Sequence, residues 1–218
     1  MKITKLAQSC ILIESNNTNI LVDPGSILFE ESLLIEYWND IDVILVTHKH
    51  ADHFCQPAIS QMLKNAKTKL YSSSEVARAY PEIDVNIVKV GDEISGDSFK
   101  IDVVDSVHGY MPFLKGDGEV NEGLGYIIEL EGKRIYAVGD SICFKNDYKC
   151  DILCVPVSGR GLVMGTFEAA LYAKEVEASL VIPVHMDNPK FPVNLDDINI
   201  DFKDLDYKIL RTKDFLVL

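Results

Sequence analysis

The chain has 218 residues, of which 47% are hydrophobic and 25% charged, and its formal net charge is −13. This composition is typical of a soluble globular protein with one hydrophobic core, so we expect a single domain over residues 1–218. No cluster of Lys and Arg suits a polyanion, and no run of about 20 apolar residues could span a bilayer. We therefore expect neither nucleic acid nor membrane as a partner. A cytoplasmic location is expected because polar residues interrupt any signal-peptide core.

The first quarter of the chain predicts strands that lead into a histidine-rich segment. Asn16 and Asn17 lie between two apolar runs and favour a hairpin turn. Asp23-Pro24-Gly25 is typical of a strand end. We predict strands at residues 3–6, 10–14, 19–22 and 42–46 and a short helix at residues 32–38.

The rest of the chain alternates helices with short strands. Thr166 is the expected N-cap of a helix whose Phe167, Ala170, Leu171 and Val176 can share one face. Strands in meandering order with helices outside them predict an α+β fold in which two sheets pack face to face. We predict helices at residues 56–65, 74–79 and 166–177, strands at 69–71, 85–90, 99–104, 124–130, 133–138, 151–157 and 179–184, and a closing sheet edge near 207–210 and 215–218.

Residues 109–123 form a long segment that is rich in Gly, Pro and Asp and lacks periodicity. Loops of this length in compact domains are often functional lids. Tyr110, Met111 and Phe113 could line a substrate entrance or fold back onto the core, and the sequence favours neither.

The five histidines of the chain lie where strands are predicted to end. Three fall in His48-Lys49-His50-Ala51-Asp52-His53, directly after an apolar run. His108, Asp140 and His185 each follow another apolar run. If these strands share a direction, their C-terminal ends meet at one edge of the sheets, and the side chains are expected to meet there too.

The residue types and their spacing favour metal binding. His48 and His50 are two residues apart, so in extended backbone they point the same way and can chelate one ion. Asp52 and His53 follow a turn and can face a second ion. Imidazole suits Zn²⁺, Fe²⁺ and Mn²⁺, and a carboxylate such as Asp140 can bridge two cations. A lone histidine after a strand is more often a core or surface residue, but the whole constellation favours a metal centre.

On these residues the chain resembles the metallo-β-lactamase superfamily of hydrolases. The hallmark His-x-His-x-Asp-His is His48 to His53, and the later landmarks are matched by His108, Gly139-Asp140 and His185. Within the superfamily the chain is most similar to the L-ascorbate-6-phosphate lactonase-like branch, on the strength of Ile20-Leu21-Val22-Asp23-Pro24, Pro156-Val157-Ser158-Gly159-Arg160-Gly161 and Ile182-Pro183-Val184-His185. It departs from the branch at Gln8, where members often carry histidine.

The resemblance implies a four-layer αββα sandwich with a binuclear metal site at one edge of its two sheets. One divalent cation would be held by His48, His50 and His108 and the other by Asp52, His53 and His185, with Asp140 between them. A bridging hydroxide would then attack a small ester, lactone or phosphodiester. Asp52 and Asp140 are the implied catalytic carboxylates, and Asp52 could also accept or relay the proton. Zn²⁺ is the favoured metal, with Mn²⁺ and Fe²⁺ as alternatives.

Several assignments stay open. Asp23 could fix a histidine tautomer from outside the ligand set, but the turn reading is slightly favoured. Arg160 could bind a phosphate or carboxylate of the substrate or be a surface charge, and Tyr110 is a second candidate substrate contact. The substrate is expected to be a small molecule, with an anionic one as an option, and a homo-oligomer is equally open.

Three rival functions are weaker. A di-iron redox enzyme of the same fold usually carries glutamate where this chain has His50, and a flavin domain for which no length remains. A non-catalytic metal protein is disfavoured because the ligand set is complete. A nuclease of the same fold is disfavoured by the net charge of −13.

Overall fold

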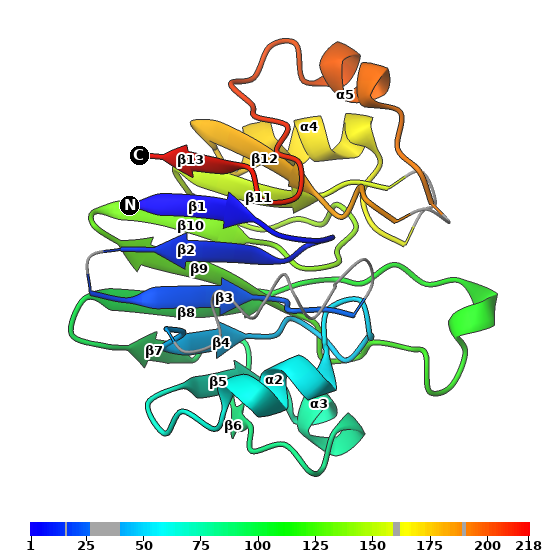
Figure 1. The fold of residues 1–218 in the computed structure, drawn as a ribbon. Helices are drawn as coiled ribbons and strands as arrows, with labels where there is room; N and C mark the ends of the chain where they lie inside the picture. The colour runs from blue at the N-terminus through cyan, green and yellow to red at the C-terminus, as the bar shows by residue number, and fades with distance from the viewer. Residues whose placement is uncertain (16, 27–39, 159–161, 189–190) are drawn as a thin grey trace.

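The computed structural model describes residues 1–15, 17–26, 40–158, 162–188 and 191–218. Two mixed β-sheets pack face to face, with helices on both outer faces (Figure 1), so the predicted α+β sandwich of four layers is confirmed. Asn16 of the predicted turn and the predicted helix at residues 32–38 lie outside the described residues. No helix in the described ranges combines the length and the apolar character that crossing a bilayer requires.

The first sheet has seven strands and the second has six. In spatial order the first contains β13 (Phe215–Val217), β1 (Lys2–Lys5), β2 (Ile11–Glu14), β3 (Asn19–Val22), β4 (Val43–Leu45), β5 (Lys69–Ser72) and β6 (Asn86–Ile87). The second contains β12 (Leu180–Val184), β11 (Ile152–Pro156), β10 (Lys133–Ala137), β9 (Leu124–Leu130), β8 (Phe99–Asp105) and β7 (Glu93–Ser95). The helices are α2 (Gln56–Met62), α3 (Ser74–Ala79), α4 (Thr166–Glu175) and α5 (Leu195–Asp201), with a 3-10 turn η1 (Pro112–Leu114).

Strand direction brings the predicted site together. β3, β4 and β5 are mutually parallel, and β10, β11 and β12 are mutually parallel. β8 and β10 are each antiparallel to β9, so β8 runs in the same direction as β10. The C-terminal ends of β4 and β12 point to the same side of the molecule in Figure 1. The segments that follow β4, β8, β10 and β12 therefore start from one edge of the sandwich.

Three apolar layers hold the sandwich together. Alternate residues of β2 face opposite ways, with Ile11 and Ile13 between the sheets and Leu12 beneath α2 and α3. β11 is buried on both faces, since Cys154 packs between the sheets and Leu153 packs against α4. Full burial of such a side chain stabilises the fold by about 1.5–3 kcal/mol. This double burial explains why β4 and β11 appear in the sequence as continuous apolar runs.

The prediction for α4 was wrong in two respects. Its N-cap is Gly165, and the Thr166 hydroxyl donates instead to Asp201 of α5. Phe167 and Leu171 are 60% and 48% exposed, while the buried side chains are Ala169, Ala170, Tyr172 and Ala173. The small alanine side chains face the sheet, which allows the helix to lie close to it. The strand β7 and the helix α5 were not predicted.

Candidate metal centre

Every histidine of the chain lies at the edge where β4, β8, β10 and β12 end. The potential ligand atoms form two groups, and within each group they lie within 4.8 Å of one another. The first group is His48, His50 and His108, and the second is Asp52, His53, Asp140 and His185. The sequence-predicted ligands are thus brought together, from both sheets.

Two glycines hold the backbone of the histidine motif against its surroundings. A Cβ atom on Gly25 would lie 1.7 Å from the carbonyl oxygen of Asp52, so only glycine fits there. Gly139 has φ +72°, and a Cβ atom on it would lie 2.7 Å from the Cβ atom of Thr47. Because Gly139 directly precedes Asp140, this close approach brings the end of β10 against the start of the motif.

Asp23 is a partner of the motif as well as a turn residue. Its carboxylate accepts hydrogen bonds from the Thr47 backbone N–H, the Thr47 hydroxyl and His53 Nδ1, each at 2.8 Å. It also has φ 48°, in the left-handed region. The slightly favoured turn reading was therefore incomplete, since Asp23 holds His53 with Nε2 directed into the site.

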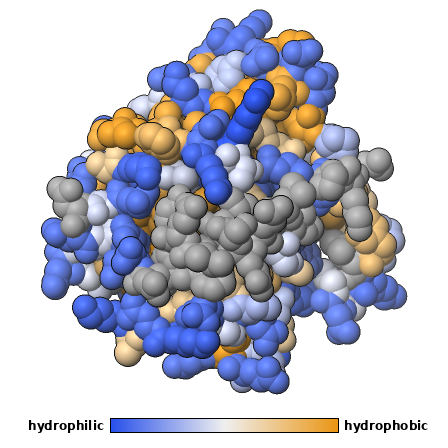
Figure 2. Space-filling model, viewed as in Figure 1, coloured by the Kyte–Doolittle hydropathy of each residue, from blue (hydrophilic) through white to orange (hydrophobic). Residues whose placement is uncertain are grey.

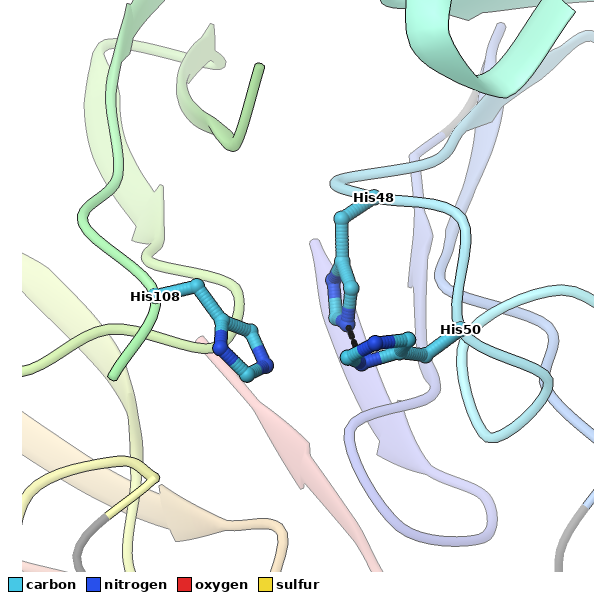
Figure 3. A group of neighbouring side chains, drawn as sticks. All are labelled: His48, His50 and His108. Atoms are coloured by element: carbon cyan, nitrogen blue, oxygen red, sulfur yellow. Dashed lines mark hydrogen bonds between the residues drawn. The ribbon is translucent and has the colours of Figure 1, made fainter. Parts of the chain in front are cut away.

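The first group presents unprotonated ring nitrogens to a common point. The Thr47 hydroxyl donates to Asp23, so it is left to accept from His48 Nδ1 at 3.1 Å. The Gly118 carbonyl, 2.9 Å from His50 Nε2, can only accept, and that fixes the proton on Nε2. If both rings are neutral, His48 Nε2 and His50 Nδ1 each carry a lone pair, and the two nitrogen atoms lie 3.0 Å apart. Figure 3 shows these two nitrogens facing each other. A shared cation is the natural partner for such a pair.

His108 completes this group from the other sheet (Figure 3). Its Nδ1 lies 2.7 Å from the carbonyl oxygen of Gly109, which fixes the proton there and leaves Nε2 free. Burial lowers the pKa of His108, and burial lowers that of His48 well below its ordinary value. These two rings are therefore neutral at neutral pH and have no proton to lose before they bind a metal.

Glu75 on α3 ties the long loop to the motif. One of its carboxylate oxygens accepts from Lys49 Nζ at 2.8 Å, and the other accepts from the backbone N–H groups of Asn121 and Glu122 at 3.0 and 3.1 Å. Lys49 lies between two histidines of the first group, and the loop carries Gly118. The first group thus depends on a loop that α3 holds in place.

The second group is more deeply buried and pairs histidines with carboxylates. His53 Nε2 lies 3.1 Å from Asp140 Oδ1, and His185 Nε2 lies 3.1 Å from Asp140 Oδ2 and 3.3 Å from Asp52 Oδ2. Even so, His53 Nε2, His185 Nε2 and Asp140 Oδ1 are buried without a hydrogen bond of normal geometry to any described residue. Buried polar atoms are rarely left in this way, and coordination of a cation would satisfy all three.

The charges of the second group follow from these pairings. Burial alone would lower the pKa of His185, but Asp140 and Asp52 outweigh it and raise that pKa to about 9. Asp140 and Asp23 likewise outweigh burial and raise the pKa of His53 well above its ordinary value. Burial would raise the pKa of Asp140, yet His185 and His53 hold it well below its ordinary value. Two nitrogens and two carboxylates in one place form a donor set that suits a divalent cation.

The predicted substrate contacts are less well placed. Tyr110 and Phe113 on the long loop are 60% and 70% exposed, so of the two open interpretations the structure contradicts the one in which these side chains fold back onto the core. The substrate role of Tyr110 stays a prediction. Arg160 lies outside the described residues. The partners that the sequence did not reveal are Thr47, Glu75 and Gly118, whose contacts join segments far apart in the chain.

Fold and site together define a class, the metal-dependent hydrolases of the metallo-β-lactamase fold. The family model for the beta-lactamase superfamily domain matches residues 2–185. The chain belongs to that superfamily, as the histidine motif predicted.

Individual relatives agree with this membership. A protein named UPF0173 metal-dependent hydrolase from Korarchaeum cryptofilum is 29% identical over 202 residues, which cover 88% of this chain and 85% of the relative. Igni18, a metallo hydrolase from Ignicoccus hospitalis, superposes with a TM-score of 0.80 at 19% identity, covering 99% of this chain and 97% of its own. CmlA, a diiron β-hydroxylase from Streptomyces venezuelae, superposes with a TM-score of 0.75 at 14% identity, covering all of this chain and 54% of its own. At these identities the two structures show the fold alone.

Proposed function

We propose that the protein hydrolyses a small ester, lactone or phosphodiester at a pair of divalent cations, with Zn²⁺ as the expected metal. The observation that carries this proposal is the position of Asp140. Its Oδ2 lies 3.8 Å from His108 Nε2 in the first group and 3.1 Å from His185 Nε2 in the second, and its Oδ1 lies 3.1 Å from His53 Nε2. A buried carboxylate between two ligand groups is suited to bridging two cations.

The remaining ligands follow from the two groups. His48, His50 and His108 would hold one cation, and Asp52, His53 and His185 the other. The support lies in the ring nitrogens, because His48, His50, His53 and His108 each have the nitrogen away from the site bonded to an oxygen of the protein. Such bonds fix the ring orientation, so the inward nitrogens are held in position to coordinate a cation.

Bound cations would supply the chemistry by lowering the pKa of a coordinated water from 15.7 to roughly 7 and by polarising the oxygen of the scissile bond. The chain's own carboxylates would handle the proton. Burial would raise the pKa of Asp52, but His53 and a hydrogen bond with His185 outweigh it and lower that pKa. Asp52 is therefore ionised at neutral pH and can accept a proton. Its side chain is 17% exposed against 4% for Asp140, which makes Asp52 the more accessible acceptor.

Metal content and hydrolysis, measured on the same preparation, test the proposal. We expect about two equivalents of Zn, Mn or Fe by elemental analysis, and turnover of at least one member of a panel of chromogenic esters, lactones and phosphodiesters that a chelator abolishes. Asp140→Ala should lose both metal and turnover, whereas Asp97→Ala, at an exposed aspartate between β7 and β8, should keep both. A protein that stays metal-free after reconstitution would contradict the proposal.

The same measurements separate the rival functions. Two irons with oxygen consumption and no hydrolysis would point to a redox enzyme. Salt-dependent cleavage of DNA or RNA would point to a nuclease, which the net charge of −13 disfavours.

A further inference from the structure

His185 differs from the other four histidines in the surroundings of its ring. In each of the others, one ring nitrogen lies within hydrogen-bond distance of a protein oxygen, which supports the ring from outside the site. His185 directs its Nε2 atom toward Asp140 and Asp52. Its other ring nitrogen, Nδ1, is buried without a hydrogen bond of normal geometry to any described residue. The ring of His185 therefore needs a partner for Nδ1.

The chemistry of a histidine ligand defines what that partner must be. When Nε2 of a neutral imidazole binds a metal, the ring proton lies on Nδ1, which is then a hydrogen-bond donor. Histidine ligands almost always donate this proton to a carboxylate, a carbonyl oxygen or water, because a buried donor without an acceptor is destabilising. Solvent does not reach His185 Nδ1. The acceptor is therefore expected to be an oxygen atom of the protein.

The turn between β1 and β2 lies directly against His185. The backbone N–H of His185 donates to the Gln8 carbonyl at 3.2 Å, and the Gln8 N–H donates to Asp187 Oδ2 at 3.1 Å. The fully buried Lys5 ammonium donates to the same Asp187 oxygen. In Figure 1 this turn lies on the side of the molecule at which β12 ends. The two segments are thus fixed to each other by three hydrogen bonds.

The backbone of both residues in this contact is unusual. Gln8 has φ 53° and His185 has φ 63°, both in the left-handed region. Residues other than glycine adopt this conformation at a cost in free energy, and they keep it only where the surrounding structure holds them. The contact between Gln8 and His185 is therefore a specific one.

Gln8 and Ser9 carry further unpaired polar atoms at this contact. Hydrophilic side chains lie over much of the face that Figure 2 shows, where solvent can bond them. Gln8 and Ser9 are instead 1% and 6% exposed. Gln8 Oε1, Gln8 Nε2 and the Ser9 hydroxyl are buried without a hydrogen bond of normal geometry to any described residue. Buried polar atoms are rarely left in this way, so these three atoms also need partners.

We propose that Gln8 is the positioning residue of His185, with Oε1 accepting the Nδ1 proton and Nε2 donating to the Ser9 hydroxyl. This arrangement gives each of the four unpaired atoms a partner, because an amide offers both an acceptor and a donor. In the reverse order His185 would donate to Ser9 and Ser9 to Gln8 Oε1, which leaves Gln8 Nε2 unpaired. The inference rests on the proposed function for the cation at His185.

NMR spectra of the zinc-loaded, ¹⁵N-labelled protein test the hydrogen bond. One-bond ¹H–¹⁵N spectra follow the Nδ1–H proton of His185, which we expect far downfield because it is bonded. Gln8→Met keeps the length of the side chain but removes the acceptor, so it should move this signal upfield. Gln8→Glu keeps an acceptor oxygen and should leave the signal downfield. Ser9→Ala should move it less than Gln8→Met does.

Two results would overturn the inference. One is a His185 signal at the position of an unbonded N–H in the unaltered protein, a measurement that decides the question even where Gln8→Met does not fold. The other is a signal that Gln8→Met leaves in place or that Ser9→Ala moves further.

Metal affinity gives the matched comparison. Loss of an outer partner typically lowers metal affinity 10–100-fold, so Gln8→Met should weaken zinc binding at the second group about ten-fold, and Gln8→Glu should stay within about three-fold of the unaltered protein. Gln61→Met, at a glutamine of α2 that accepts a hydrogen bond from Lys64, should change nothing. Equal losses in Gln8→Met and Gln8→Glu would mean that Gln8 only fills space, which contradicts the hydrogen bond.

The role of Gln8 and the proposed function can fail separately. Long-range ¹H–¹⁵N spectra show whether zinc shifts the Nε2 resonance of His185. If it does, and the Nδ1–H signal ignores Gln8→Met, the metal centre stands and the role of Gln8 is wrong. If zinc leaves Nε2 of His185 unchanged, the proposed ligand set is wrong, and the role of Gln8 falls with it.

Discussion

The two ligand groups are built on different supports. The second group is held by strand ends and by Asp23, which lies directly after β3, and its His53, Asp140 and His185 are all at most 5% exposed. The first group relies on a long loop, since the partner of His50 is Gly118 and the loop is fixed by Glu75. Electrostatics differ as well, because carboxylates raise the pKa of His53 and His185 whereas burial lowers that of His48 and His108. The second group is therefore held by strand ends and carboxylates that favour protonated histidines, whereas the first group depends on a loop and on burial that favours the neutral form of two of its histidines.

The largest effect is expected at Asp140, which lies between the two ligand groups. Asp140→Asn keeps the shape but removes the bridging charge, so we expect hydrolysis to fall roughly a thousand-fold, corresponding to several kcal/mol of lost stabilisation. Steady-state turnover and metal content check this, with Asp97→Asn as the control. If Asp140→Asn kept near-normal activity with only one metal bound, the halves would work independently and the bridging role would be wrong.

The pH dependence of metal binding should tell the halves apart. In protein stripped of metal, a cation entering the second group must displace the proton of His185, whose pKa is about 9. The affinity of the second group for the cation should therefore rise by roughly ten-fold per pH unit for each displaced proton between pH 6.5 and 8. The lowered pKa values of His48 and His108 predict that a cation entering the first group displaces no proton from these two rings over that range. Calorimetric titration with Zn²⁺ in a competing chelator measures both steps, and parallel pH slopes would refute the distinction.

Removal of the charge of Asp23, the partner of His53, should weaken metal binding at the second group. Asp23→Asn leaves a side chain of the same size without the charge, and loss of such a partner typically costs 10–100-fold in metal affinity, so we expect about thirty-fold. Long-range ¹H–¹⁵N spectra of the five histidines identify which ring is affected. The resonances of His53 and His185 should change, while those of His50 and His108, whose outer nitrogens face backbone carbonyls, should be retained.

The smallest effect is expected at the first group, which the long loop supports. Glu75→Gln keeps the size of the side chain but weakens its bonds to Lys49 and to the loop N–H groups. We expect about a five-fold loss of affinity at the first group only, because His50 keeps its other contacts. Glu82→Gln, at a glutamate that accepts a hydrogen bond from Gln56, is the control. A loss confined to the second group would mean that the loop does not position His50.

The sequence predicted the strands and the clustering of the histidines and aspartates better than what surrounds them. β3 was predicted at its observed bounds, and the histidine motif was correctly placed after a buried strand, because local periodicity and residue type carry that information. α5 was missed because it is largely polar, and Ile198 and Phe202 make it stable only by packing against distant residues. The roles of Asp23 and Glu75 come from contacts 24 to 47 residues apart, which no local pattern contains.

The proposed ligands come from both sheets, and this has a mechanical consequence. A cation that held His53 from the first sheet and His185 from the second would be a cross-link between the sheets that closes a loop of more than a hundred residues. A link of this kind restricts the unfolded chain in the same way as a disulfide bond, and its strength depends on metal supply rather than on redox state. Removal of metal by a chelator should therefore first destabilise the end of the sandwich that carries the proposed metal centre. Amide exchange should accelerate at the C-terminal ends of β4 and β12, while the opposite ends of the strands stay protected.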